Sequence, residues 1–135
     1  MTSPRGVIIS HEFGHHIADE LAEDTGWNRP TGKYIELVAD CFAGIWAANV
    51  WYEGYLDAGD QDEAIAALES IGDPPGFRGT GAHGQPAERS KAFEVGYIGV
   101  QAGTDELGNN IAAYAPATPR ACIDWYWRYD PNAPR

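Results

Sequence analysis

The sequence is poor in lysine and arginine and lacks any long hydrophobic run. Its 135 residues include 9 Lys and Arg against 20 Asp and Glu, which gives a formal net charge of -11 at pH 7. A chain this acidic repels phosphate backbones, so no nucleic acid is expected as a partner. No apolar stretch approaches the ~18 residues that span a bilayer. The start, MTSPRGVIIS, lacks the apolar core and cleavage site of a signal peptide. The sequence thus shows no targeting or membrane segment, and it leaves localisation and oligomeric state open.

Cysteine is also scarce, with Cys41 and Cys122 as the two residues of this type. Two cysteines cannot form a dense disulfide framework, and they do not define the redox compartment. A disulfide between them is compatible with the sequence, but spacing alone does not supply its geometry. Hydrophobic residues make up 44% of the chain and charged residues 21%, a globular composition. This length predicts a single domain over residues 1–135.

Two helices are predicted in the first half of the chain. The first runs from about Pro4 to Glu23, and Gly26 lies just past its end. Apolar residues recur there at every fourth position and form one stripe, namely Ile9, Phe13, Ile17 and Leu21. The second runs from about Tyr34 to Leu56 and stops near Gly59, with a buried face made of Leu37, Val38, Phe42, Ile45 and Val50.

The second half has weaker signals. Asp60 and Glu63 are typical of a capping box that opens a short third helix. A stretch rich in Gly and Pro follows from Gly72 to Gln85 and is predicted to be an ordered loop, after which Pro86 opens a fourth helix. No convincing strand pair is visible. The predicted fold is therefore mainly α.

A metal-binding motif lies on the first predicted helix. His11-Glu12-Phe13-Gly14-His15 has the pattern H-E-x-x-H, and positions i and i+4 share one face of a helix. Two imidazoles spaced in this way can bind one zinc ion, and the intervening Glu12 is suited to take a proton from the attacking water. The alternative is a surface helix that carries two histidines by chance.

A second polar pair supports the metal interpretation. Glu36 and Asp40 are again one helical turn apart. An antiparallel helix pair joined by a short loop would bring Glu36 to the histidines as a third ligand and leave the fourth position for water. Asp40 could accept a hydrogen bond from the free ring nitrogen of a ligating histidine. Small residues on the same face would permit close helix approach, namely Ala43, Gly44 and Ala47. The alternative is a pair of solvated carboxylates.

The chain resembles a bacterial family usually called putative neutral zinc metallopeptidases. The matching stretches are HEFGHHI at 11–17, ELVADCFAGIWA at 36–47, SIGD at 70–73 and AHGQPAERSKAFEVGY at 82–97. The resemblance covers about residues 7–100 and implies a gluzincin-like helical core. It also implies that Zn²⁺ is bound by His11, His15 and Glu36, and that Glu12 is the catalytic base.

The sequence departs from the family pattern at both ends. Members usually have a long segment before the zinc helix, often with a membrane anchor, whereas about ten residues precede His11 here. In gluzincin folds a strand in that position borders the cleft and pairs with extended substrate. An upstream edge sheet is therefore expected to be missing or minimal. Residues 103–135 match the family poorly and are expected to form an irregular, aromatic-rich tail.

Three further polar residues each have two interpretations. His16 points about 100° around the helix from the motif and is expected to pack or hydrogen-bond rather than bind metal. The resemblance places a histidine at His83, which would be catalytic if it hydrogen-bonds the oxyanion, or else a loop histidine that faces solvent. Arg89 could pair with Glu36, Asp40 or a substrate carboxylate, or remain solvated on its helix.

Two functions are therefore carried forward. The first is a zinc metalloendopeptidase that acts on a peptide or protein, with Glu12 taking a proton from water and returning it to the leaving amine. The second is a non-catalytic zinc-binding remnant or fragment of a larger metallopeptidase. The intact Glu12 favours the first, and the short upstream segment favours the second. A peptidase dedicated to one repressor ranks last, because that type lacks the ELVADCFAG continuation. The sequence does not define the substrate or the cleavage specificity.

Overall fold

The computed structural model describes residues 4–54, 59–75, 82–104 and 108–129. This part of the chain is mainly helical, as predicted. The helices are α1 (Pro4–Thr25), α2 (Lys33–Tyr52), α3 (Asp60–Ser70), α4 (Pro86–Tyr97) and α5 (Pro119–Trp125), and α5 is followed by a 3-10 turn, η1 (Trp127–Tyr129). A minimal antiparallel sheet, β1 (Gly103–Thr104) and β2 (Asn110–Ile111), lies between α4 and α5 in the chain. None of the helices described is long and apolar enough to cross a membrane.

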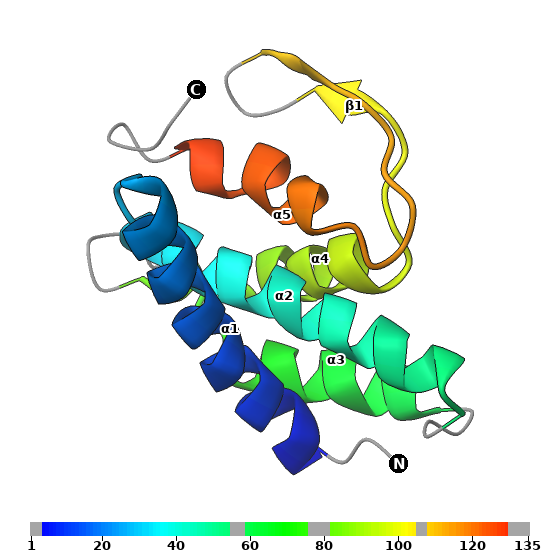
Figure 1. Cartoon of the computed structure of the whole chain (residues 1–135). Coiled ribbons are helices and arrows are strands. Elements are labelled where there is room, and N and C mark those ends of the chain that lie inside the picture. Colours follow the sequence, from blue (N-terminus) through cyan, green and yellow to red (C-terminus); the bar gives the residue numbers. More distant parts are fainter. Residues whose placement is uncertain (1–3, 55–58, 76–81, 105–107, 130–135) are drawn as a thin grey trace.

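Helix α2 is central, with α1, α4 and α5 packed around it (Figure 1). Two of these helices approach its backbone at glycine. A Cβ on Gly14 of α1 would lie 2.6 Å from the carbonyl oxygen of Ala39, and a Cβ on Gly44 would collide with the carbonyl oxygen of Phe93 in α4. The sequence predicted that small residues such as Gly44 permit close helix approach. Gly44 makes this approach to α4, whereas the close approach of α1 to α2 is made by Gly14 against Ala39.

The apolar core has two parts that meet on α2. One part joins α2 and α4 to the C-terminal segment, and its buried members include Leu37, Val38, Phe42, Val95, Cys122, Tyr126 and Trp127. The other joins α1, α2, α3 and α4 through Val7, Ala43, Ala47, Ala64, Leu68 and Phe93. Helix α2 is therefore held on several sides, which fixes the positions of the polar residues near its beginning.

Glycine sets where the first two helices end. Gly26 has a φ of 74° and donates its N–H to the carbonyl of Ala22 at 2.9 Å, so α1 ends at Thr25. Gly54 has a φ of 83°, and α2 ends at Tyr52. The sequence predicted a longer second helix that stopped near Gly59. That prediction overlooked the earlier glycine, and its last residues fall outside the described part of the chain.

The start of α3 also differs from the prediction. Gly59, with a φ of 96°, is the cap residue, and no side-chain cap bond is present there. Asp60 is instead the first residue of the helix. The predicted capping box of Asp60 and Glu63 is therefore wrong, because the chain enters this helix through a left-handed glycine. A capping box is found at α4, where Glu88 accepts the backbone N–H of Gln85 at 3.0 Å.

Most of the apolar stripe of α1 faces solvent, and only Leu21 at its end packs against the core. Ile9, Phe13 and Ile17 are 69%, 58% and 37% exposed. Four-residue spacing correctly indicated a helix, but it did not identify the buried side. Because His11 faces α2, Phe13 lies about 200° around the helix from that contact and turns outward.

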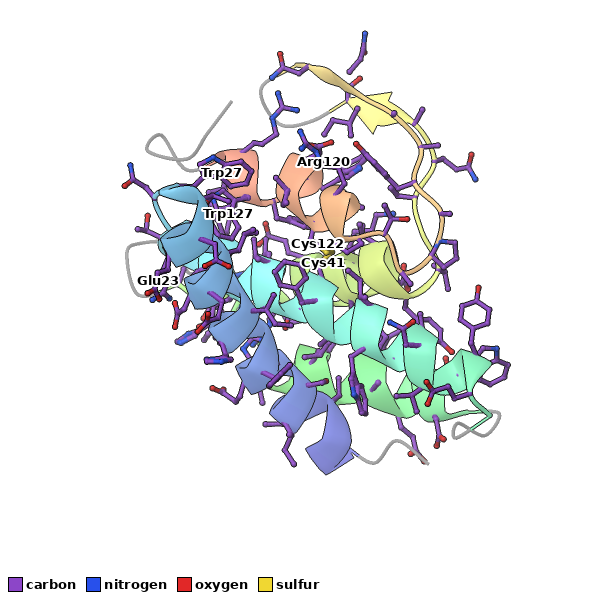
Figure 2. All side chains as sticks on the ribbon, in the orientation of Figure 1. Glu23, Trp27, Cys41, Arg120, Cys122 and Trp127 are labelled. Atoms are coloured by element: carbon purple, nitrogen blue, oxygen red, sulfur yellow. A yellow bond between two sulfur atoms is a disulfide. The ribbon has the colours of Figure 1, made fainter. Side chains whose placement is uncertain are left out.

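The C-terminal third is more regular than predicted. Its described part contains the small sheet, α5 and η1, and a disulfide joins Cys122 of α5 to Cys41 of α2 (Figure 2). Trp127 is fully buried, and its Nε1 donates to the carbonyl of Asn28 at 3.1 Å. The sequence missed α5 because seven residues are too few to show helical periodicity.

Candidate metal centre

Three potential metal ligands converge where α1 meets the first turn of α2. The Nε2 atoms of His11 and His15 lie 3.1 Å apart. Oε2 of Glu36 lies 2.9 Å from Nε2 of His11 and 2.8 Å from Nε2 of His15. His11 is buried and the other two are half-buried. Among the residues that the structure describes, this is the one group of three or more His, Cys, Asp or Glu side chains whose ligand atoms all lie within 4.8 Å of one another.

The donor set fits zinc. Two imidazole nitrogens and one carboxylate oxygen form a known catalytic set, which keeps a fourth position open. With bonds of ~2.0–2.2 Å in a tetrahedron, such ligand atoms stand about 3.3 Å apart. The observed separations of 2.8–3.1 Å therefore require only a small expansion of the cluster. Two rings and a carboxylate that already meet at one point lose little conformational freedom when a cation joins them.

The charges around the cluster favour a cation. Burial lowers the pKa of His11, but hydrogen bonds with Asp40 and Glu36 outweigh burial and raise this pKa to about 9. Burial raises the pKa of Glu36, yet hydrogen bonds from His11 and His15 outweigh burial and hold that pKa well below its usual range. The two carboxylates thus stabilise positive charge at the facing ring nitrogens, whether a proton or a metal ion supplies it.

Asp40 contacts the far side of the His11 ring. Its Oδ1 lies 2.6 Å from Nδ1 of His11, so Nε2 of the same ring is left to face Glu36. A buried carboxylate is costly unless it is paired, and Arg89 of α4 supplies the partner. Its Nε donates to Oδ2 of Asp40 at 2.8 Å, and its Nη2 donates to Oδ1 at 2.9 Å.

Two further contacts of Arg89 extend this network. Its Nη1 donates to the carbonyl of Ile71, just after α3, at 3.2 Å, and its Nη2 also lies 3.3 Å from Nδ1 of His11. Arg89 is 2% exposed, and Asp40 is fully buried. The sequence left the partner of Arg89 open among three choices. The structure pairs it with Asp40, which is 49 residues away and therefore not recognisable by local spacing.

Glu12 of the motif, and His16 directly after the motif, lie on the solvent side of α1. Glu12 is exposed and is not part of the three-residue ligand group. His16 is also exposed, with Nε2 3.9 Å from Oε1 of Glu20. In the described part of the chain the motif therefore contributes two histidines to the cluster and leaves its glutamate accessible.

His83 lies at the edge of the cluster. It is 58% exposed, and its Nε2 is 3.8 Å from Oε1 of Glu36. The loop that carries it is held by Asp73, which accepts the backbone N–H groups of His83 and Gly84 at 2.7 and 2.8 Å. Asp73 was not among the site residues predicted from the sequence. The signal that the sequence offered was the position of Asp73, an acidic residue at the start of the glycine-rich loop.

Comparisons with known proteins identify a family and several relatives of this chain. Residues 3–97 match the model of the family described as putative neutral zinc metallopeptidase. The protein named "Uncharacterized protein YpfJ" from Escherichia coli (strain K12) is 37% identical over 81 residues, which cover 51% of this chain and 28% of that protein. "Uncharacterized protein Rv2575" from Mycobacterium tuberculosis (strain ATCC 25618 / H37Rv) is 31% identical over 114 residues, covering 67% of this chain and 39% of that protein. The chain thus spans less than half the length of either relative. No solved structure matches it significantly.

Proposed function

Because the chain belongs to the family described as putative neutral zinc metallopeptidase, we propose that it hydrolyses peptide bonds with a zinc ion held by His11, His15 and Glu36. The observation that carries the proposal is the convergence of their ligand atoms within 2.8–3.1 Å. The substrate class that follows is a peptide or protein. Zinc, when bound, polarises a substrate carbonyl and lowers the pKa of water toward ~7.

Asp40 and Arg89 support the ligand set in this proposal. Asp40 accepts a hydrogen bond from Nδ1 of His11, which keeps the tautomer whose Nε2 lone pair faces the metal. Arg89 neutralises Asp40 in the buried interior and fixes both carboxylate oxygens. His11 is thereby held in one orientation before any metal or substrate arrives.

Glu12 serves as the base. It follows His11 directly and is exposed, so its carboxylate is accessible to water and substrate. It takes a proton from the attacking water and returns it to the leaving amine. His83 reaches the cluster from the opposite loop, and its Nε2 hydrogen-bonds the oxyanion that develops on the substrate carbonyl.

The test compares two conservative variants on the same helix. Glu12→Gln keeps size and shape but removes the base, and Glu23→Gln makes the same change at an exposed position near the end of α1 (Figure 2). The zinc-loaded parent and Glu23→Gln should cleave an unfolded protein at equal rates. Glu12→Gln should retain zinc and lose roughly 100-fold or more in rate.

Two outcomes of this experiment would contradict the peptidase proposal. Equal cleavage by Glu12→Gln and the parent would remove Glu12 from the mechanism. A parent that holds zinc but cleaves no unfolded protein would instead favour the alternative function, a zinc-binding domain without catalysis.

A further inference from the structure

A hollow lies between α2, α4 and the C-terminal segment, where α5 packs against both helices (Figure 1). Its volume is about 190 Å³, and its apolar walls are made by Tyr34, Leu37, Trp125 and Tyr126, which define the aromatic hollow. In other proteins an apolar cavity of about 150 Å³ takes up benzene. The aromatic hollow therefore has room for one side chain of the size of leucine or phenylalanine.

The rim of the aromatic hollow carries an excess of positive charge. Glu88 and Lys91 of α4 also line the hollow. Oε2 of Glu88 lies 2.7 Å from Nζ of Lys33, so these two charges offset each other, whereas Lys91 is exposed. A lysine or arginine side chain would meet Lys91 at the entrance and is disfavoured. The charges and the walls together select an uncharged, apolar side chain.

Trp125 is the wall of the hollow that is least constrained by hydrogen bonds. Its Nε1–H is buried and has no hydrogen-bond partner in the described part of the chain, which is uncommon in folded proteins. The indole ring is therefore held by packing alone. One packing contact is with β1, where a Cβ on Gly103 would lie 3.1 Å from Cη2 of the ring. A side chain that fills the hollow would touch this ring, so Trp125 can report its binding.

The aromatic hollow and the metal centre share the first turn of α2. Leu37 follows the predicted ligand Glu36, and it lies close to the loop that carries His83, since a Cβ on Gly84 would be 3.3 Å from Cδ2 of Leu37. Positions 34 and 36 are about 200° apart around a helix, so the hollow and the metal centre flank this turn on different sides. A helix is roughly 10 Å wide, and an extended peptide rises about 3.3 Å per residue. A peptide bound at the metal centre therefore reaches the hollow about three residues from the scissile bond.

We propose that the aromatic hollow is a substrate subsite that binds the side chain of leucine, phenylalanine or a residue of similar size. The residue that occupies it lies about three positions from the scissile bond. This inference rests on the proposed peptidase function, and it adds the chemical class of one substrate residue. The alternative is a packing gap between α5 and its neighbours that binds nothing.

The first experiment measures binding and needs no catalysis. N-acetyl-phenylalaninamide, titrated into the zinc-loaded protein, should produce a saturable shift of one indole N–H signal in ¹⁵N–¹H spectra, and Trp125→Phe assigns that signal. N-acetyl-alaninamide should produce no such shift, because its methyl group buries too little apolar surface.

Two phenylalanine substitutions test whether the shift reports the hollow. Thr104 lines the hollow and is exposed on β1, so Thr104→Phe should fill the hollow and abolish the shift. Gln101→Phe places the same ring at an exposed position outside the lining and should leave the shift unchanged. A parent protein without a saturable shift, or an equal shift in Thr104→Phe, would overturn the proposal.

The second experiment compares peptides that carry leucine or alanine about three residues from the scissile bond. The zinc-loaded parent should cleave the leucine peptide with a kcat/KM roughly 10–100-fold higher, as is usual for a hydrophobic subsite. Thr104→Phe should lose this preference, and Gln101→Phe should keep it. An unchanged preference in Thr104→Phe would show that the hollow is not the subsite. If the parent cleaves no peptide, the peptidase proposal fails by itself, and the titration still decides whether the hollow binds an apolar side chain.

Discussion

The side of α1 that faces α2 buries polar residues beside Val7 and Ala18, whereas large apolar residues lie exposed on its outer side. On the side facing α2, His11 is 5% exposed and Ser10 is 6% exposed. On the outer side, Phe13 and Ile9 remain more than half exposed. The difference shows that the partners on α2 and α4 decide how this helix is oriented. A buried polar ring is tolerated because both of its nitrogens have partners, and the apolar side chains stay partly hydrated in exchange.

The surroundings of the two sides differ in the same way. The histidine side is bounded by charged groups that are themselves paired, Asp40 and Arg89 above all. Phe13 on the outer side lines an apolar hollow of about 270 Å³ that α1 shares with α2, where Phe42 and Trp46 also line it. If this comparison is correct, substitutions on the histidine side should affect metal binding and stability strongly. Those on the outer side should affect them weakly.

The largest expected effect is on zinc binding by adjacent histidines. His15→Ala removes a ligand, so zinc affinity should fall by more than the roughly 100-fold upper figure for residues that only orient a ligand. His16→Ala removes the same side chain one position later, where the ring is exposed, and should leave affinity unchanged. Competition with a chromogenic chelator measures the zinc affinity of both variants. An equal loss of zinc affinity in the two variants would show that the inner and outer sides of α1 do not differ in metal binding.

The next effect concerns Asp40. Asp40→Asn leaves the buried guanidinium of Arg89 without its counter-charge, which should destabilise the fold by about 3–5 kcal/mol. The same change should weaken zinc binding by roughly 10–100-fold, because His11 loses its anionic partner. Urea unfolding of the metal-free protein and chelator competition measure the two losses separately.

A matched double variant sharpens the prediction for Asp40. Adding Arg89→Met to Asp40→Asn removes the unpaired charge, so stability should be partly recovered while the zinc affinity is not. Recovery of both would mean that Asp40 acts on the metal only through global stability. If Asp40→Asn and the parent had the same free energy of unfolding, the buried ion pair between Asp40 and Arg89 would be contradicted.

A smaller effect is expected at the helix contact. Gly14→Ala adds one methyl group where a Cβ would lie 2.6 Å from the carbonyl oxygen of Ala39. Because that neighbour is backbone, α1 and α2 must move apart, and the cost should be about 1–3 kcal/mol. Zinc affinity should fall as well, since the ligands come from both helices. A more stable Gly14→Ala protein, as expected from helix propensity alone, would show that the helices are not in close contact.

The smallest effect is expected at the adjacent residue, Phe13. Phe13→Ala removes far more atoms than Gly14→Ala adds, and a buried Phe→Ala typically costs about 3–5 kcal/mol. Because Phe13 is 58% exposed, the loss of stability should stay below about 1 kcal/mol, with zinc affinity unchanged. Thermal or urea unfolding provides the measurement. A loss as large as that of a core phenylalanine would mean that this side is buried in solution.

The sequence predicted the elements that depend on short-range patterns. The histidine pair on α1, the Glu36 and Asp40 pair on α2 and the proline start of α4 all lie within one or two turns, where spacing specifies the shared face. The mainly α fold and the family are confirmed. The roles of the individual site residues stay predictions.

Features that depend on long-range contacts were not predictable in this way. Arg89 meets Asp40 across 49 residues, and the disulfide joins positions 81 residues apart. Asp73 acts on a loop across ten or eleven positions. Local periodicity carries no information about such pairs, and it could not show which side of α1 would face α2.

The most direct test of the account compares the zinc content of two glutamate variants. Glu12→Gln and Glu36→Gln make the same chemical change at residues that lie near the same histidines, but only Glu36 has an oxygen within 2.9 Å of both Nε2 atoms. After saturation with zinc and removal of free metal, elemental analysis should find about one zinc per chain in the parent and in Glu12→Gln. Glu36→Gln should hold little. Full zinc in Glu36→Gln, or loss of zinc from Glu12→Gln alone, would contradict the ligand set on which the proposed function rests.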